Sequence, residues 1–101
     1  MIKVSVLYPA GDGKTFDMDY YCSSHMPMVQ KKTLCKSIAV EQGLAGGAPG
    51  ASPTYMAMGH LYFDSVAEFQ EAFAPHAAEI MGDIPNYTNI QPIIQISEVK
   101  L

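Results

Sequence analysis

The chain has 101 residues, of which 49% are hydrophobic and only 16% are charged, and its formal net charge is −4. This length is typical of one domain with a modest hydrophobic core. The sequence contains no arginine, and its six lysines form no basic stripe. Nucleic acids bind to basic surfaces in which arginine is prominent, so the composition argues against a nucleic-acid partner.

The two cysteines, Cys22 and Cys35, are not spaced as a CxxC motif and are too few for a disulfide framework. The N-terminus shows no signal peptide, and no apolar run is long enough to span a bilayer. We therefore expect a cytoplasmic protein with free thiols and no membrane partner.

The first predicted elements are a strand and a helix. Residues 2–8 alternate between apolar and polar side chains, which predicts a strand. Asp17 then predicts the N-cap of a helix, and Pro27 is expected to end or kink that helix near His25. The apolar face of this helix is predicted to carry Met18, Tyr21, Cys22, His25 and Val29. Cys22 is interpreted as a small core residue.

Two further strands are predicted at residues 37–42 and 54–63. Between them, residues 43–53 are rich in Gly, Ala, Pro and Ser, which predicts a long mobile loop.

A capping box formed by Ser65 and Glu68 predicts the start of a second helix. Pro75 interrupts this helix, and residues 76–81 predict another short helical piece. Residues 88–99 predict the last strand, in which Pro92 marks an edge or a bulge.

The order β-α-β-β-α-β predicts an α+β fold over residues 1–101, with a four-stranded antiparallel sheet and both helices on one face. The other face is predicted to be about half apolar, because polar side chains alternate there with Leu7, Met56, Met58, His60, Tyr62, Ile93 and Val99. A large uncovered apolar face indicates an interface. We expect a homodimer in which two sheets pack face to face.

Several segments carry a resemblance to a known family. These are Asp17-Met18-Asp19-Tyr20-Tyr21, His25-Met26-Pro27-Met28, residues 73–76 through 84–87, and residues 90–99. In these segments the sequence resembles the EthD family, named for a protein linked to ethyl tert-butyl ether degradation. The resemblance covers nearly the whole chain, and the tyrosine pair followed by His-x-Pro is its most diagnostic part.

The resemblance implies a ferredoxin-like subunit that dimerises into an α+β barrel. Relatives in the wider barrel superfamily include cofactor-free monooxygenases of aromatic polyketides, polyketide cyclases, lactone isomerases and haem enzymes. The family name describes a pathway and not a reaction, so membership predicts the fold better than the function.

His25 is the candidate catalytic residue, because imidazole suits proton transfer near neutral pH and the family motif contains it. The small residues Ala57 and Gly59 are predicted to leave a pocket opposite His25. Tyr8 and Tyr21 are expected to face the same space, where they would bind an aromatic substrate or donate to an oxyanion. The alternative is that His25 is a core histidine bonded to a backbone carbonyl, and that the tyrosines are core residues.

The other two histidines are interpreted separately. His76 starts a short helical piece and is either a substrate contact or a capping residue. The topology places it far from His25. His60 lies in the middle of a strand and is expected to be buried and hydrogen-bonded. The three histidines have no zinc-site spacing, so we expect neither a metal nor an organic cofactor.

Two functions fit these observations. The first is an enzyme, such as a cofactor-independent oxidoreductase, isomerase or lyase, that acts on a small hydrophobic or aromatic metabolite. Its residues would be His25 as acid or base, Tyr8 and Tyr21 for substrate orientation with His76 as a further candidate for that role, and the 43–53 loop as a lid. The second is a non-catalytic protein that binds such a compound for a neighbouring oxygenase, with His25 structural.

Overall fold

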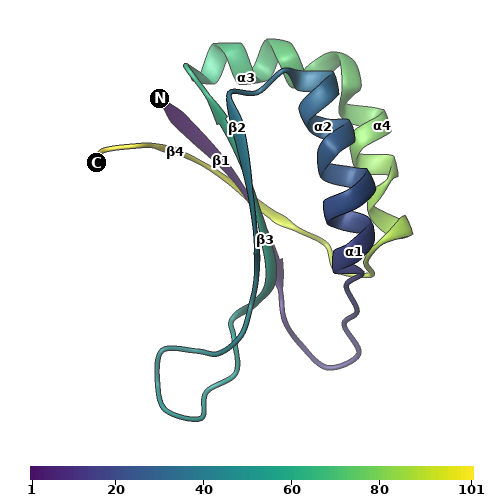
Figure 1. Cartoon of the computed structure of the whole chain (residues 1–101), viewed down its shortest axis with the longest axis vertical. Helices are drawn as coiled ribbons and strands as arrows, with labels where there is room; N and C mark the ends of the chain where they lie inside the picture. The colour runs from purple at the N-terminus through teal and green to yellow at the C-terminus, as the bar shows by residue number, and fades with distance from the viewer.

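The computed structural model describes residues 1–101 and contains one four-stranded sheet. Its strands are β1 (Ile2–Pro9), β2 (Ser37–Gln42), β3 (Tyr55–Phe63) and β4 (Ile93–Glu98). All neighbouring strands are antiparallel, in the order β2-β3-β1-β4 (Figure 1). This is the predicted β-α-β-β-α-β arrangement, and it places β1 in the interior of the sheet and β4 at an edge.

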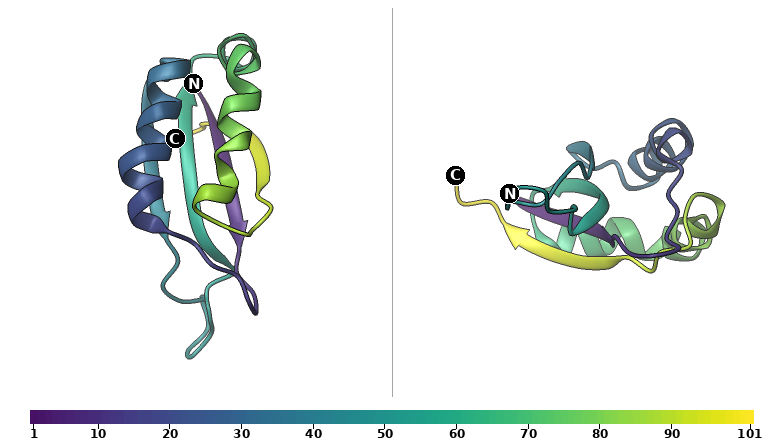
Figure 2. Two further views of the ribbon diagram at one scale, coloured as in Figure 1. Left: turned by 90° about the vertical axis from the view of Figure 1, so that its right-hand side faces the viewer. Right: turned by 90° about the horizontal axis from the view of Figure 1, so that it is seen from below.

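Two helical segments cover one face of the sheet, as Figures 1 and 2 show. The first consists of α1 (Met18–Tyr20), a π-helical turn η1 (Tyr21–His25) and α2 (Met26–Thr33). The second consists of α3 (Val66–Phe73), a 3₁₀ turn η2 (Ala74–His76) and α4 (Ala77–Gly82), followed by the 3₁₀ turn η3 (Ile84–Asn86). The core lies between these segments and the sheet, where Val4, Tyr8, Ala57 and Phe63 are at most 2% exposed.

The start of the first helical segment explains how it accommodates Pro27. The Asp17 side chain accepts a hydrogen bond from the Tyr20 N–H, which confirms the predicted N-cap. The Met26 N–H then donates to the Tyr21 carbonyl, five residues earlier. This wider turn lies immediately before Pro27, whose ring has no N–H to donate and would crowd the carbonyl of a regular helical turn. The helix therefore continues to Thr33 and does not end near His25.

The π-helical turn also changes which side chains face the core. Tyr21, His25 and Met26 are buried, whereas Cys22 is exposed. The prediction that Cys22 is a core residue is therefore wrong, because it assumed the regular 3.6-residue period. The wider turn contains one extra residue, which keeps both Tyr21 and His25 on the side facing the sheet.

The last strand is shorter than predicted. Residues 88–92 do not belong to β4, and Thr88 instead forms an isolated bridge with Phe16. The Thr88 hydroxyl donates to the Thr15 carbonyl and accepts from the Ile90 N–H. These bonds direct the chain across the end of the helical layer, and pairing with β1 starts after Pro92.

The sheet face away from the helices carries both polar and apolar side chains. His60 is buried there, between the Ser5 hydroxyl at 2.9 Å from Nδ1 and Glu41 at 2.9 Å from Nε2. Met58 and Tyr62 on the same strand are half-buried. Residues 43–54 form neither helix nor strand and extend well beyond the sheet (Figure 1).

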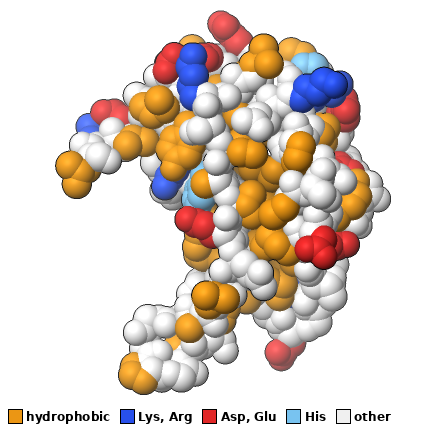
Figure 3. All heavy atoms as spheres, in the orientation of Figure 1, with side chains coloured by type: hydrophobic (Ala, Val, Ile, Leu, Met, Phe, Trp, Pro, Cys, Tyr) orange, Lys and Arg blue, Asp and Glu red, His pale blue; other side chains and the backbone are white.

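Apolar side chains gather where the sheet meets the helices, and most charged side chains lie around the margin (Figure 3). No helix is long and apolar enough to cross a membrane.

Candidate functional site

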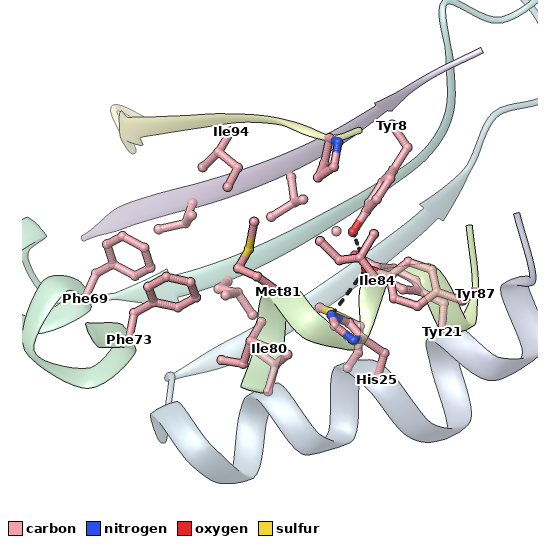
Figure 4. A pocket seen from close by; sticks show the side chains of 17 residues that line it. Tyr8, Tyr21, His25, Phe69, Phe73, Ile80, Met81, Ile84, Tyr87 and Ile94 are labelled. Atoms are coloured by element: carbon pink, nitrogen blue, oxygen red, sulfur yellow. Dashed lines mark hydrogen bonds between the residues drawn. The ribbon is translucent and has the colours of Figure 1, made fainter. Parts of the chain in front are cut away.

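A small cavity lies between the sheet and the helices, with a volume of about 60 Å³. Of the 17 residues that line it, 14 are hydrophobic. Phe69 and Phe73 lie toward one end and Tyr8, Tyr87 and His25 toward the other (Figure 4). The cavity is therefore an apolar space with one polar corner.

Three side chains from separate parts of the chain form this polar corner. The Tyr8 hydroxyl lies 2.6 Å from the Tyr87 hydroxyl. The Tyr87 hydroxyl lies 3.4 Å from Nε2 of His25. The corner thus joins β1, η1 and the segment that follows η3.

The imidazole of His25 packs against two tyrosine rings and is bonded at its edge to a carboxylate. Its ring is stacked on Tyr21 with a centroid distance of 5.4 Å and is tilted against Tyr87 at 4.6 Å. Its other nitrogen, Nδ1, lies 2.8 Å from Oδ2 of Asp83. The residue is only 4% exposed, so the sequence-based candidate is an enclosed residue on the cavity wall.

The Asp83 carboxylate accepts hydrogen bonds from two further side chains. The Tyr20 hydroxyl and the Asn86 amide each lie 2.8 Å from Oδ1. Burial raises the pKa of Asp83, but the hydrogen bonds from Asn86, His25 and Tyr20 outweigh this effect and lower the pKa below its usual value. The carboxylate is therefore ionised at neutral pH.

The protonation states at the corner follow from burial. Burial lowers the pKa of His25, although Asp83 acts in the opposite direction, so the ring is neutral at pH 7. Burial also raises the pKa values of Tyr8, Tyr21 and Tyr87. These phenols stay protonated and act as hydrogen-bond donors. His25 is thus the one group of the corner that accepts a proton at neutral pH.

Gly59 lies directly under the Tyr21 hydroxyl. A β-carbon at position 59 would overlap that oxygen and would lie 3.1 Å from Cζ of the ring. The space opposite this glycine is therefore filled by Tyr21, although Gly59 also forms part of the cavity wall. The glycine is needed for close approach of a buried tyrosine to the sheet.

The predicted site residues are only partly brought together. Tyr8, Tyr21, His25 and Gly59 all line the cavity. Ala57 is fully buried in β3 and does not line it. His76 ends η2, where α3 and α4 meet, and it also lies outside the cavity wall.

Sequence reasoning missed Tyr87 and Asp83 as site residues. Tyr87 lies in a segment that carries the family resemblance, so the aromatic residue after Ile84-Pro85-Asn86 was a usable signal. Asp83 precedes the same turn and is 58 residues from His25, and nothing in the local pattern indicates this pairing. No group of three or more His, Cys, Asp or Glu residues is placed to hold a metal ion.

Comparison with known proteins gives one family. The EthD domain model matches residues 13–91. An uncharacterized 11.0 kDa protein of Rhodococcus erythropolis, from the thcB-thcC intergenic region, is 35% identical over 92 residues. The match covers 88% of this chain and 85% of that protein.

Two solved structures resemble the whole chain. An EthD-like protein from Ralstonia eutropha JMP134 is 50% identical, with a TM-score of 0.94, over 99% of this chain and 92% of that one. An ethyl tert-butyl ether degradation (EthD) family protein from Bacillus halodurans C-125 has a TM-score of 0.69 at 18% identity, with 99% of each chain covered. The second likeness supports the fold alone.

Proposed function

This chain belongs to the EthD family, and we propose that it binds a small hydrophobic or aromatic metabolite in the sheet–helix cavity and transfers a proton at His25. The observation that carries this proposal is the neutral His25 at the polar corner of an otherwise apolar space. Apolar pockets with a few convergent polar groups are the usual form of small-molecule sites.

The proposed step is a proton transfer from a ligand C–H or O–H to Nε2 of His25. The negative charge that develops on the ligand oxygen would accept hydrogen bonds from the Tyr8 and Tyr87 hydroxyls, which stay protonated. Return of the proton to another ligand atom is an isomerisation. Reaction of the anion with dioxygen as a co-substrate is the start of a cofactor-free oxygenation.

The size of the cavity indicates how a ligand would enter. Its volume of about 60 Å³ is less than half of the ~150 Å³ of an engineered cavity that takes up benzene. Met81 and Ile94 line it and are 42% and 47% exposed, so they mark its outer side. Methionine is flexible and unbranched, and we propose that Met81 moves to admit the ligand between α4 and β4.

Proton transfer is tested with small aromatic ketones such as acetophenone in D₂O, with loss of the α-proton NMR signal as the readout. The wild type is expected to accelerate this exchange, and His25→Gln is expected to abolish the acceleration. His60→Gln serves as the matched control, because His60 is also buried and bonded to a carboxylate but lies on the other face. Exchange that persists in His25→Gln would contradict the role of His25.

A second candidate function is that of a binding protein without catalysis, favoured by the predominance of apolar residues in the cavity wall. The same experiment separates the two functions. Binding of the ketone, seen as chemical-shift changes at Tyr8 and Met81, without acceleration of exchange in the wild type would favour the binding protein. Met81→Ala is expected to speed ligand association, whereas Met58→Ala, on the opposite face, is not.

We also propose that the chain forms a homodimer through the sheet face away from the helices and the edge strand β4. The support is apolar exposure on that face: Ile93 is 52% exposed and Val99 is 39% exposed. Burying the exposed half of one such side chain contributes about 1 kcal/mol. Native mass spectrometry is expected to show a dimer that Ile93→Lys dissociates and Leu44→Lys, in the exposed loop, leaves intact. A monomeric wild type would refute this proposal.

A further inference from the structure

We propose that Asp83 is a positioning residue that fixes the neutral ring of His25 as the Nδ1–H tautomer, so that the lone pair of Nε2 faces the polar corner. This inference rests on the proposed function of His25 and specifies which of its two nitrogens takes the proton.

Both oxygens of the Asp83 carboxylate have their own donors. Oδ1 accepts from the Tyr20 hydroxyl and from the Asn86 amide, each at 2.8 Å, and Oδ2 lies 2.8 Å from Nδ1 of His25. An ionised carboxylate only accepts hydrogen bonds. Nδ1 must therefore be the donor in the bond to Oδ2.

A neutral imidazole carries one ring proton, so a proton on Nδ1 leaves Nε2 without one. The group that faces Nε2 is the Tyr87 hydroxyl at 3.4 Å. That hydroxyl then donates to Nε2 and accepts from the Tyr8 hydroxyl at 2.6 Å. The whole network has one consistent direction, which runs from Tyr8 through Tyr87 to the lone pair on Nε2 of His25, and the Tyr87 hydroxyl would turn from Nε2 to a bound ligand when that lone pair takes the proton.

The carboxylate is also held in place by separate helical elements. Tyr20 comes from α1, Asn86 comes from η3, and Asp83 itself follows α4. An open groove formed by both helical segments lies on the outer side of Asp83, whose side chain is 17% exposed, compared with 5% for His25. The carboxylate therefore stands between solvent and the buried ring, and it cannot rotate without losing its bonds to Tyr20 and Asn86.

Replacing Asp83 by asparagine has a definite expected result. Tyr20 and Asn86 are both donors, so the amide oxygen of Asn would stay with them and the amide NH₂ would face Nδ1. Nδ1 would then have to accept, and the ring proton would move to Nε2. The proton acceptor would be lost from the polar corner without any change in shape, the effect seen when the aspartate of a Ser-His-Asp triad is changed to asparagine.

The test is ¹⁵N-detected NMR of the histidine rings at pH 8 in the wild type, Asp83→Asn and Glu41→Gln. Glu41→Gln is the matched control, because Glu41 bonds the ring of His60 at 2.9 Å. We expect His25 to be the Nδ1–H tautomer in the wild type and in Glu41→Gln, and the Nε2–H tautomer in Asp83→Asn. A wild-type His25 in the Nε2–H form, or a tautomer unchanged in Asp83→Asn, would overturn the proposal.

The ketone exchange assay supplies the second readout. Asp83→Asn is expected to lower the exchange rate by about 10²-fold or more, with ketone affinity within about threefold of the wild type. Asp83→Glu is expected to restore the tautomer and part of the rate. If Asp83→Asn does not fold, Asp83→Ala, which removes the acceptor for the Nδ1 proton, should give a mixture of tautomers, and a pure wild-type spectrum would count against the proposal. Correct tautomers without exchange in the wild type would refute the proposed function and leave the assignment of Asp83 standing.

Discussion

Substitution of Gly59 by alanine tests whether Tyr21 is held as tightly as its contacts indicate. The new β-carbon would overlap the Tyr21 hydroxyl and lie 3.1 Å from Cζ, whereas carbon atoms prefer separations of about 3.5–4.0 Å. Tyr21 is 1% exposed, and its ring contacts Phe16 at 5.0 Å and His25 at 5.4 Å between centroids. The ring is therefore closely packed against Phe16 and His25, which limits how far it could shift.

The expected cost is that of overpacking a well-packed core, about 1–3 kcal/mol in the free energy of unfolding. For a domain of this size, each kcal/mol lowers Tm by roughly 4–8 °C. Urea unfolding measured by circular dichroism gives the free energy directly. Gly47→Ala is the control, because a β-carbon at Gly47 would meet nothing within 4 Å.

Tyr21→Phe identifies the colliding atom. Without the hydroxyl, the closest atom to the new β-carbon is Cζ at 3.1 Å, which a shift of a few tenths of an ångström relieves. Gly59→Ala should then cost about 1–2 kcal/mol less in the Tyr21→Phe background than in the wild type, a coupling typical of residues in contact. An equal cost in both backgrounds, or a neutral Gly59→Ala, would refute the reasoning.

Three further predictions concern pH, backbone strain and thiol reactivity. Burial lowers the pKa of His25 in the folded state, so the unfolded chain binds a proton at this residue at a higher pH than the folded chain does. The free energy of unfolding should therefore fall as the pH drops below about 6.5, by up to ~1.4 kcal/mol per pH unit. Urea titrations at several pH values should show this slope in the wild type and a flatter slope in His25→Gln. Leu34 is 79% exposed and has a φ of 55°, a left-handed backbone conformation that glycine adopts more easily than leucine. Leu34→Gly should therefore raise the free energy of unfolding by about 0.5–1 kcal/mol. Leu44→Gly is the control and should not raise it, because Leu44 is exposed but does not have a positive φ. Cys22 is exposed, whereas Cys35 is buried and burial raises the pKa of its thiol. Iodoacetamide should therefore alkylate Cys22 before Cys35. If mass spectrometry finds the reverse order, the fold described around η1 is contradicted.

The sequence pattern predicted the fold well because strands and helix starts are local features. Alternation in residues 2–8, the Asp17 N-cap and the Ser65 N-cap all occur in the structure as predicted. Cys22 and residues 88–92 were misplaced because the structure departs from the regular period in the first case and tertiary contacts override the local pattern in the second. The π-helical turn before Pro27 moves Cys22 outward, and the contacts of Thr88 with Thr15 and Phe16 keep that segment out of the sheet.

The candidate site was predictable only in part for the same reason. His25 has a motif and a helix face that point to it, Tyr21 shares that helix face, and Tyr8 was expected to face the same space from the first strand. Asp83 lies in a turn 58 residues along the chain from His25, and no periodic pattern in the sequence indicates that these two side chains meet. Gly59 was correctly predicted to lie in this region, but it was expected to leave an empty pocket. The sequence does not show that the Tyr21 side chain fills the space above this glycine.

The π-helical turn at Tyr21–His25 is equivalent to a one-residue insertion into an ordinary α-helix. Closing this turn to the regular period with all five residues kept would rotate everything before it by about 100° about the helix axis relative to α2. Tyr20 would then swing away from Asp83, and Tyr21 would leave its place above Gly59. The wider turn therefore absorbs the extra residue and keeps the two ends of this helical segment in the rotational register that places Tyr20 at Asp83 and Tyr21 above Gly59.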